Sequence, residues 1–125
     1  MQELTKAEEQ VMQSLWKLEK GFLKDIVEEF PEPRPAYTTI STVIRVLVKK
    51  GFIGFKTYGK VNEYYPKLSK NEYAKNRFSG TLKDYFEGSL ANFASFFTND
   101  KEVAVKDLEE MQAIIEQEIQ KRKNT

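Results

Sequence analysis

An unbroken run of thirty residues without a carboxylate is the feature of this sequence most able to do chemistry. No Asp or Glu occurs between Glu32 and Glu63, and the stretch carries six cations: Arg34, Arg45, Lys49, Lys50, Lys56 and Lys60. Since the net charge of the whole chain is only +1, these residues form a local excess of positive charge. Such a surface is suited to binding phosphates, because a carboxylate facing a nucleic-acid backbone would repel it.

Hydroxyl side chains accompany these cations on a helix predicted from about Ala36 to Lys50. Apolar residues at helical spacing predict its buried stripe, which consists of Ile40, Val43, Ile44, Leu47 and Val48. The remaining stripe of this helix is predicted to face solvent. The unpaired backbone amides at a helix N-terminus also favour the binding of anions. The residues expected to contact DNA, on this helix and the hairpin after it, are Thr38, Thr39, Ser41, Thr42, Arg45, Lys49, Lys56 and Lys60.

Some of these assignments stay open on the sequence alone. Thr39 can touch DNA or face partly inward, and Arg45 can reach a guanine edge or a phosphate. Tyr37 and Tyr58 can pack on sugars and phosphates, or equally cover the edge of the core.

Two further helices and a β-hairpin must position these side chains. A capping box of Thr5 and Glu8 opens a helix over about residues 6–19, and a shorter helix ends before Pro31. After Gly51, β-rich runs at 52–56 and 61–65 flank a turn that contains a glycine. Three helices followed by a hairpin is the order of a winged helix-turn-helix, whose third helix lies in a DNA major groove.

The second half of the chain is predicted to be helical. A second capping box, Ser69 with Glu72, opens one long helix to about Phe97, and a final helix runs from about Val103 to Lys121. The fold class is therefore mainly α with a small β-hairpin, divided into a winged domain (1–68) and a C-terminal helical dimerisation domain (69–125).

The apolar residues of this second half are too many to leave in water on a monomer. We expect a second copy to cover them, and the alternative is packing of the same helices onto the winged domain of their own chain. The residues assigned to dimerisation are Phe78, Leu82, Phe86, Phe93, Phe97, Leu108, Met111, Ile115 and Ile119.

Composition excludes most enzyme chemistry. The chain has no Cys and no His, which removes disulfides, zinc sites built on thiolate or imidazole, and the Ser/His and Cys nucleophiles. We expect no enzymatic activity, no cofactor and no metal. The start, Met1-Gln2-Glu3, lacks the basic and apolar regions of a signal peptide, so a cytoplasmic protein is expected.

Several motifs resemble the penicillinase repressor family, of the BlaI/MecI type. They are Leu4-Thr5-Lys6-Ala7-Glu8, Val11-Met12, Leu15-Trp16, Tyr37-Thr38-Thr39-Ile40-Ser41-Thr42, Leu47-Val48-Lys49-Lys50-Gly51 and Tyr64-Tyr65-Pro66. The resemblance implies a dimeric winged-helix repressor that binds palindromic operators ahead of β-lactamase or related genes, through its third helix and wing. Matched by position, the resemblance implies that the operator is contacted by Thr38, Thr39, Ser41, Thr42 and Arg45. It implies a contact from the wing by Lys60.

The resemblance also implies a mode of induction. In that family a membrane sensor protease responds to β-lactam, and the repressor is cut within its C-terminal helices. The corresponding bond here is Ser95-Phe96, where the family's best-known repressors carry Asn before the Phe. Copper-responsive relatives bind metal through C-terminal cysteines, which this chain lacks.

A second function class remains open beside the repressor. A winged-helix module can use a basic face to bind an acidic protein partner, or merely for solubility. Affinity for duplex DNA separates the two classes: if six phosphates are neutralised per dimer, log K should fall by roughly 5 per decade of salt.

Overall fold

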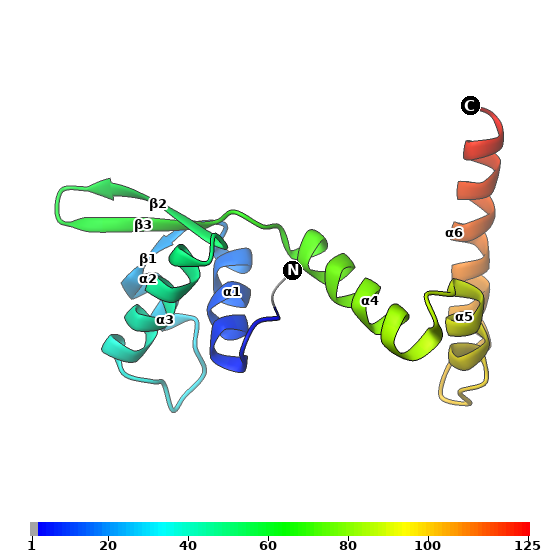
Figure 1. Ribbon diagram of the computed structural model, residues 1–125, viewed down its shortest axis with the longest axis horizontal. Coiled ribbons are helices and arrows are strands. Elements are labelled where there is room, and N and C mark those ends of the chain that lie inside the picture. Colours follow the sequence, from blue (N-terminus) through cyan, green and yellow to red (C-terminus); the bar gives the residue numbers. More distant parts are fainter. Residues whose placement is uncertain (1–2) are drawn as a thin grey trace. The chain divides into compact units, whose positions relative to one another are not determined.

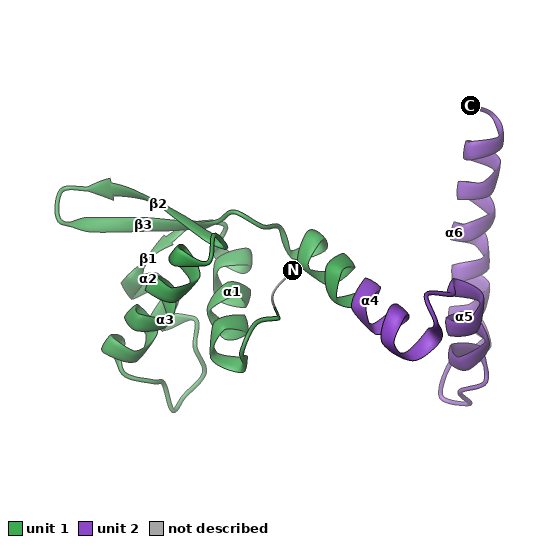
Figure 2. Ribbon diagram, viewed as in Figure 1, with its two compact units in different colours: residues 1–78 green, residues 79–125 purple. Residues whose placement is uncertain are grey.

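The computed structural model describes residues 3–125 and is mainly helical, with one small antiparallel sheet (Figure 1). The predicted fold class is confirmed. The expectation about a signal peptide falls on Met1 and Gln2, which lie outside the described residues. The chain divides into two compact units, residues 1–78 and residues 79–125 (Figure 2).

Three helices of the first unit follow the predicted order. They are α1 (Lys6–Leu18), α2 (Leu23–Glu28) and α3 (Tyr37–Lys49). The predicted capping box opens α1: the Thr5 hydroxyl accepts from the amide of Glu8 at 3.1 Å, and the Glu8 carboxylate accepts from the amide of Thr5 at 2.9 Å. At the start of α2, the Asp25 carboxylate accepts in the same way from the amide of Phe22.

The sheet has one strand more than the sequence predicted. The hairpin consists of β2 (Ile53–Tyr58) and β3 (Val61–Pro66), and β1 (Gly21–Phe22) pairs with the other side of β3. Two residues are too few to show the alternation that marks a strand, which is why β1 escaped prediction. The hairpin turn is also tighter than expected: only Gly59 and Lys60 separate the strands, and Gly59 has a φ of 63°.

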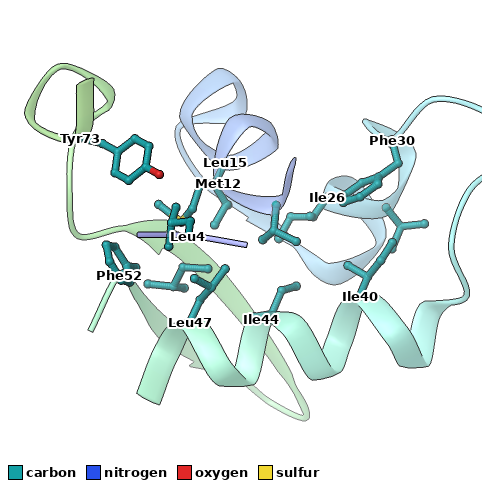
Figure 3. Packing of buried hydrophobic residues seen from close by; sticks show 13 residues of the cluster. Leu4, Met12, Leu15, Ile26, Phe30, Ile40, Ile44, Leu47, Phe52 and Tyr73 are labelled. Carbon is teal, nitrogen blue, oxygen red and sulfur yellow. The ribbon is translucent and has the colours of Figure 1, made fainter. Parts of the chain in front are cut away.

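The core of this unit lies between the three helices and the base of the sheet (Figure 3). Ile40, Ile44 and Leu47 of α3 are buried as predicted, and Val43 and Val48 pack against them. The other buried apolar residues are Leu4, Val11, Met12, Leu15, Ile26, Val27, Phe30, Phe52, Ile53 and Tyr73. This packing holds α3 with one face inward, so its opposite face is presented to solvent.

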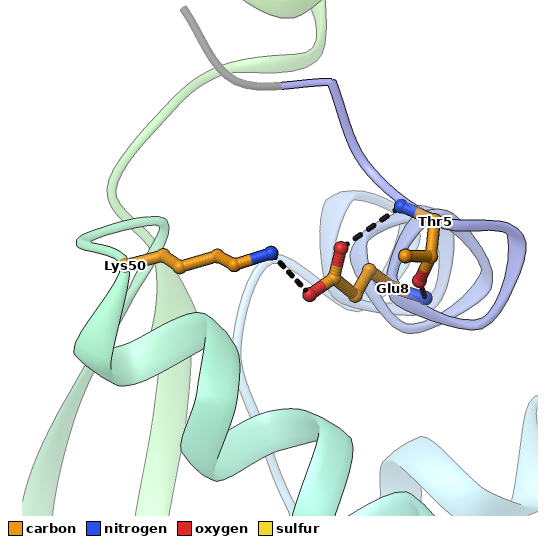
Figure 4. Close-up of polar contacts among 3 residues, drawn as sticks. All are labelled: Thr5, Glu8 and Lys50. Atoms are coloured by element: carbon orange, nitrogen blue, oxygen red, sulfur yellow. Dashed lines mark hydrogen bonds and ion pairs between the residues drawn. The ribbon is translucent and has the colours of Figure 1, made fainter.

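An ion pair joins the start of α1 to the end of α3 (Figure 4). The ammonium of Lys50 donates to Oε2 of Glu8 at 2.8 Å, and the Glu8 side chain is only 6% exposed. Burial by itself raises the pKa of Glu8. The hydrogen bonds from Lys50 and Thr5 outweigh burial, so that pKa lies below its ordinary value of 4.5.

Replacing Glu8 by Gln is expected to destabilise this unit by about 1–2 kcal/mol at neutral pH, because a partly buried ammonium loses its carboxylate. A carboxylate whose folded-state pKa is lowered adds stability above its unfolded-state pKa, and this contribution disappears as the pH falls through the folded-state value. Urea unfolding should therefore separate Glu8→Gln from the wild type at about pH 7, and the difference should disappear as the pH falls through the lowered folded-state pKa of Glu8.

The matched control for this measurement is Glu9→Gln. The Glu9 carboxylate has no hydrogen bond or ion pair among residues 3–125, so the substitution should change stability by less than about 0.5 kcal/mol. Equal effects at positions 8 and 9 would show that the contact with Lys50 contributes nothing.

The prediction of one long helix from Ser69 to about Phe97 is wrong, because this segment forms two helices. The structure has α4 (Lys70–Phe86) and α5 (Leu90–Thr98), followed by α6 (Val105–Lys123). Glu87 and Gly88 adopt φ of 54° and 73°, and the amide of Gly88 donates back to the carbonyl of Leu82. The next residue, Ser89, then caps α5 by accepting from the amide of Asn92.

The first unit extends past the predicted domain boundary at residue 68, as far as Phe78. Tyr73 of α4 is buried against Trp16 of α1, with 5.6 Å between ring centroids, and the Trp16 indole donates to the carbonyl of Leu68 at 2.8 Å. These contacts attach the start of α4 to the winged fold. The assignment of the two halves to DNA binding and dimerisation stays a prediction.

Candidate nucleic-acid interface

The outer face of α3 carries the side chains that the sequence assigned to DNA. Thr38, Thr39, Thr42, Arg45 and Lys49 are exposed, and Ser41 is half-buried. Helical spacing aligns them because the core holds the stripe of Ile40, Ile44 and Leu47 on the other side. Thr39 therefore faces solvent, which removes the inward alternative and leaves it available for contact.

The hairpin of β2 and β3 is the wing of this unit, and it extends outward beyond the three helices (Figure 1). It presents the two remaining predicted residues, Lys56 on β2 and Lys60 in the turn, both exposed. The Lys56 ammonium lies 5.3 Å from the ring centroid of Tyr58, which is close enough for a cation–π contact. Lys56 remains accessible beside a half-exposed aromatic ring.

The six cations of the acid-free stretch separate into two groups. Arg34 and Lys50 are bonded within the protein: Lys50 to the carboxylate of Glu8, and Arg34 to the backbone carbonyls of Glu28, the last residue of α2, and Phe30. Across residues 3–125, Arg45, Lys49, Lys56 and Lys60 make no ion pair with a carboxylate. Four cations are thus left for an external anion, on α3 and the wing.

The start of α3 adds free backbone donors to this face. Its first backbone hydrogen bond runs from the amide of Ile40 to the carbonyl of Ala36, and no side chain caps the helix. The amides of Thr38 and Thr39 therefore have no partner within the described part of the chain. Amides in this position, at the positive end of the helix dipole, are suited to a phosphate oxygen.

One hydroxyl on this face has its proton already committed. The Oγ1 of Thr42 donates to the carbonyl of Thr38 at 2.9 Å. In this rotamer the hydroxyl offers only lone pairs to a ligand, so it can accept from a base amino group and cannot donate to a phosphate. The bonding favours base contact for Thr42.

The sequence did not identify the residues that stiffen the wing. The Oγ1 of Thr57 donates to Oδ1 of Asn62 across the strands at 2.7 Å, and Phe22 of β1 packs edge-on against Tyr58 at 6.2 Å. Both contacts depend on a strand that continues to Tyr58. Thr57 and Tyr58 are residue types that favour strands, so they could have extended the predicted run 52–56 by two residues.

The second unit has no core of its own. None of residues 79–125 is buried, and its large apolar side chains gather on α5 and α6. Phe86 lies 5.5 Å from Phe93 and 5.2 Å from Phe96, while Phe93 stacks on Phe97 at 5.8 Å. Of the residues assigned to dimerisation, Phe78, Met111, Ile115 and Ile119 are at least 39% exposed, and Leu82, Phe86, Phe93, Phe97 and Leu108 are partly buried.

Two searches of the structure bear on other kinds of site. Among residues 3–125, no three His, Cys, Asp or Glu side chains are grouped so as to hold a metal ion. No helix over the same residues is long and apolar enough to cross a membrane.

Three helices, a wing and an acid-free outer face on α3 define a winged helix-turn-helix protein, the class that places its third helix in a DNA groove. The chain belongs to the penicillinase repressor family, whose model matches residues 4–117. This is a family of repressors and not a class of enzymes.

Relatives and a solved structure agree with this assignment. The chain is 22% identical over 122 residues to the penicillinase repressor of Bacillus licheniformis, covering 97% of this chain and 95% of that protein. It is 25% identical over 114 residues to the methicillin resistance regulatory protein MecI of Mammaliicoccus sciuri, covering 90% and 93%. The solution structure of the DNA-binding domain of the repressor BlaI matches 57% of this chain and 88% of that domain, with 26% identity and a TM-score of 0.50.

Proposed function

We propose that this chain is a DNA-binding transcriptional repressor that acts as a homodimer on a palindromic operator. The observation that carries the proposal is the set of four cations on α3 and the wing that no carboxylate of residues 3–125 neutralises. The relatives named as repressors, and the BlaI domain described as DNA-binding, support the same function. A repressor works on the chromosome, so we place this one in the cytoplasm.

The dimensions of α3 suit a major groove. Its thirteen residues span about 20 Å at 1.5 Å per residue, against a groove about 12 Å wide. The helix can cross the groove with Thr42 and Arg45 at the base edges while both ends reach phosphates. Lys49 at one end, and the amides of Thr38 and Thr39 at the other, then supply the positioning contacts.

The unburied second unit supports the homodimer. Apolar side chains in a unit without a buried residue need a partner surface, and a second copy supplies an identical set through a twofold contact. Two copies also present two recognition helices. Half-sites about one helical turn apart, ~34 Å, would match such a pair.

We further propose that induction involves a cut between Ser95 and Phe96, made by a membrane sensor protease that responds to β-lactam. This bond lies inside α5, with the Phe96 ring 66% exposed and packed on Phe86. A cut there separates α6 from α4 and divides the dimerisation surface. Mass spectrometry of the repressor recovered from β-lactam-treated host cells tests this, because fragment masses distinguish this bond from the nearby Asn92-Phe93.

Selection of bound sequences from a randomised duplex pool tests the main function. A palindromic motif with half-sites one turn apart is the expected result. For the recovered duplex, log K should fall by about 5–7 per decade of salt, since the four cations of each protomer allow up to eight phosphate contacts per dimer. A folded dimer that enriches no sequence and shows no salt dependence would instead favour the protein-interaction module.

A further inference from the structure

The connection between α2 and α3, residues 29–36, is poor in backbone donors. Pro31, Pro33 and Pro35 carry no N–H, so the carbonyls that end α2 must find other partners. The guanidinium of Arg34 supplies them: Nε donates to the carbonyl of Phe30 at 2.9 Å, and Nη2 donates to that of Glu28 at 3.0 Å. Its third nitrogen, Nη1, lies 3.4 Å from Oε1 of Glu32.

This arrangement uses the planar fork of the guanidinium. Two parallel N–H groups bridge two carbonyls in a fixed geometry, which the single ammonium of a lysine cannot reproduce. The positive charge is also matched, by Glu32 and by the negative end of α2. Arg34 lies in the acid-free stretch of the sequence, but its guanidinium is already bonded to groups of the protein itself.

Apart from Ile40, which is buried in the core, the first turn of α3 has no fixing point of its own. Its N-cap, Ala36, offers no side-chain hydrogen bond. The connection between α2 and α3 therefore sets the path of the chain into the helix. Phe30, only 5% exposed, holds this connection against the core, and the hydrogen bonds of Arg34 hold it on its outer side. This path determines the positions of Thr38 and Thr39 in the first turn of α3.

We propose that Arg34 is a positioning residue for DNA recognition, which sets the first turn of α3 without touching the duplex. The inference rests on the proposed function, because it assigns to Arg34 the placement of Thr38 and Thr39 against the operator. The sequence analysis counted Arg34 among the six cations of the acid-free stretch but assigned it no contact with DNA.

Two Arg34 variants separate positioning from phosphate contact. Arg34→Lys keeps the charge but loses the fork, and Arg34→Met loses both. Both variants should bind the selected operator duplex at least about tenfold more weakly. Neither should change affinity for a scrambled duplex of the same composition, and neither should change the salt slope for that duplex.

Lys49→Met is the matched control, because it removes an exposed cation of α3 that no carboxylate of the described chain pairs. It should weaken binding to both duplexes and lower the salt slope by about two per dimer. If Arg34→Met behaves like Lys49→Met while Arg34→Lys binds normally, Arg34 is a phosphate contact and the inference is overturned.

Hydrogen exchange on the protein without DNA provides an independent readout. The amides of residues 40–42, the first hydrogen-bonded amides of α3, should exchange faster in both Arg34 variants, while those of α1 stay protected. Unchanged exchange together with unchanged operator affinity overturns the inference even if the wild type binds its operator well. A wild type that binds no duplex would instead refute the proposed function, and the exchange data would still judge the role of Arg34 in fixing α3.

Discussion

Ile115→Asp is expected to convert the dimer to a monomer. Ile115 is 54% exposed and lies in the middle of α6, at helical spacing from Met111 and Ile119, in a unit with no buried residue. In a twofold interface the substitution buries two unpaired carboxylates. We expect dimerisation to weaken at least a hundredfold, or about 3 kcal/mol or more.

Operator binding should fall with the dimer. Once the two winged domains are no longer linked, the second half-site is bound at the bulk concentration instead of at an effective concentration in the millimolar range. We expect operator affinity to drop by about 10²–10⁴-fold, while the winged domain keeps its unfolding transition. Sedimentation velocity and binding titrations on one sample measure both effects.

Gln117→Asp is the control, since it adds the same charge at a polar and exposed position of α6. It should leave both the sedimentation coefficient and operator affinity unchanged. Leu108→Asp, on the same helix, should repeat the effect of Ile115→Asp. An intact Ile115→Asp dimer would place the interface elsewhere, and a monomeric wild type would favour packing of the C-terminal helices onto the winged domain of their own chain.

Arg45→Ala is expected to weaken operator binding by about 2–6 kcal/mol per dimer, because each protomer loses a contact of about 1–3 kcal/mol. Arg45 is exposed midway along α3 and meets no carboxylate of the described chain. If the guanidinium reads a base edge, the loss is confined to the operator and base preference relaxes at one position of each half-site. If it meets a phosphate, all sequences weaken alike and the salt slope falls.

Lys6→Ala serves as the control, because Lys6 is an exposed cation at the start of α1, outside the proposed interface. It should change the free energy of operator binding by less than about 0.5 kcal/mol and leave the salt slope unchanged. Equal losses at positions 6 and 45 would mean that binding depends on net charge alone, and no loss at position 45 would remove Arg45 from the site.

Local chemistry determines how much of the winged unit could be predicted. The box of Thr5 and Glu8 and the stripe of Ile40, Ile44 and Leu47 are signals a few residues long, so they fixed α1 and the orientation of α3. The strand β1 could not be predicted, because its identity depends on a partner more than forty residues away. Glu87 could not be predicted either, since a left-handed φ is uncommon for residues other than Gly and Asn.

The candidate site shows the same limit. Charge segregation located α3 and the wing, but a sequence does not tell a cation facing solvent from one held by the protein. Lys50 is paired with a glutamate forty-two residues earlier, and Arg34 is tied by two backbone carbonyls. The four cations that the sequence had already assigned to DNA contact meet no carboxylate among residues 3–125; they are Arg45, Lys49, Lys56 and Lys60.

The pairing of β1 with β3 also constrains how this protein is made. Gly21 and Phe22 precede α2 and α3 in the chain, and their partners, Tyr64 and Glu63, follow both helices. On the ribosome the sheet can close only after the whole segment through residue 64 has emerged. A chain that terminates before Val61 contains all of α3 but lacks β3, the central strand of the sheet, so an aborted product cannot complete this domain.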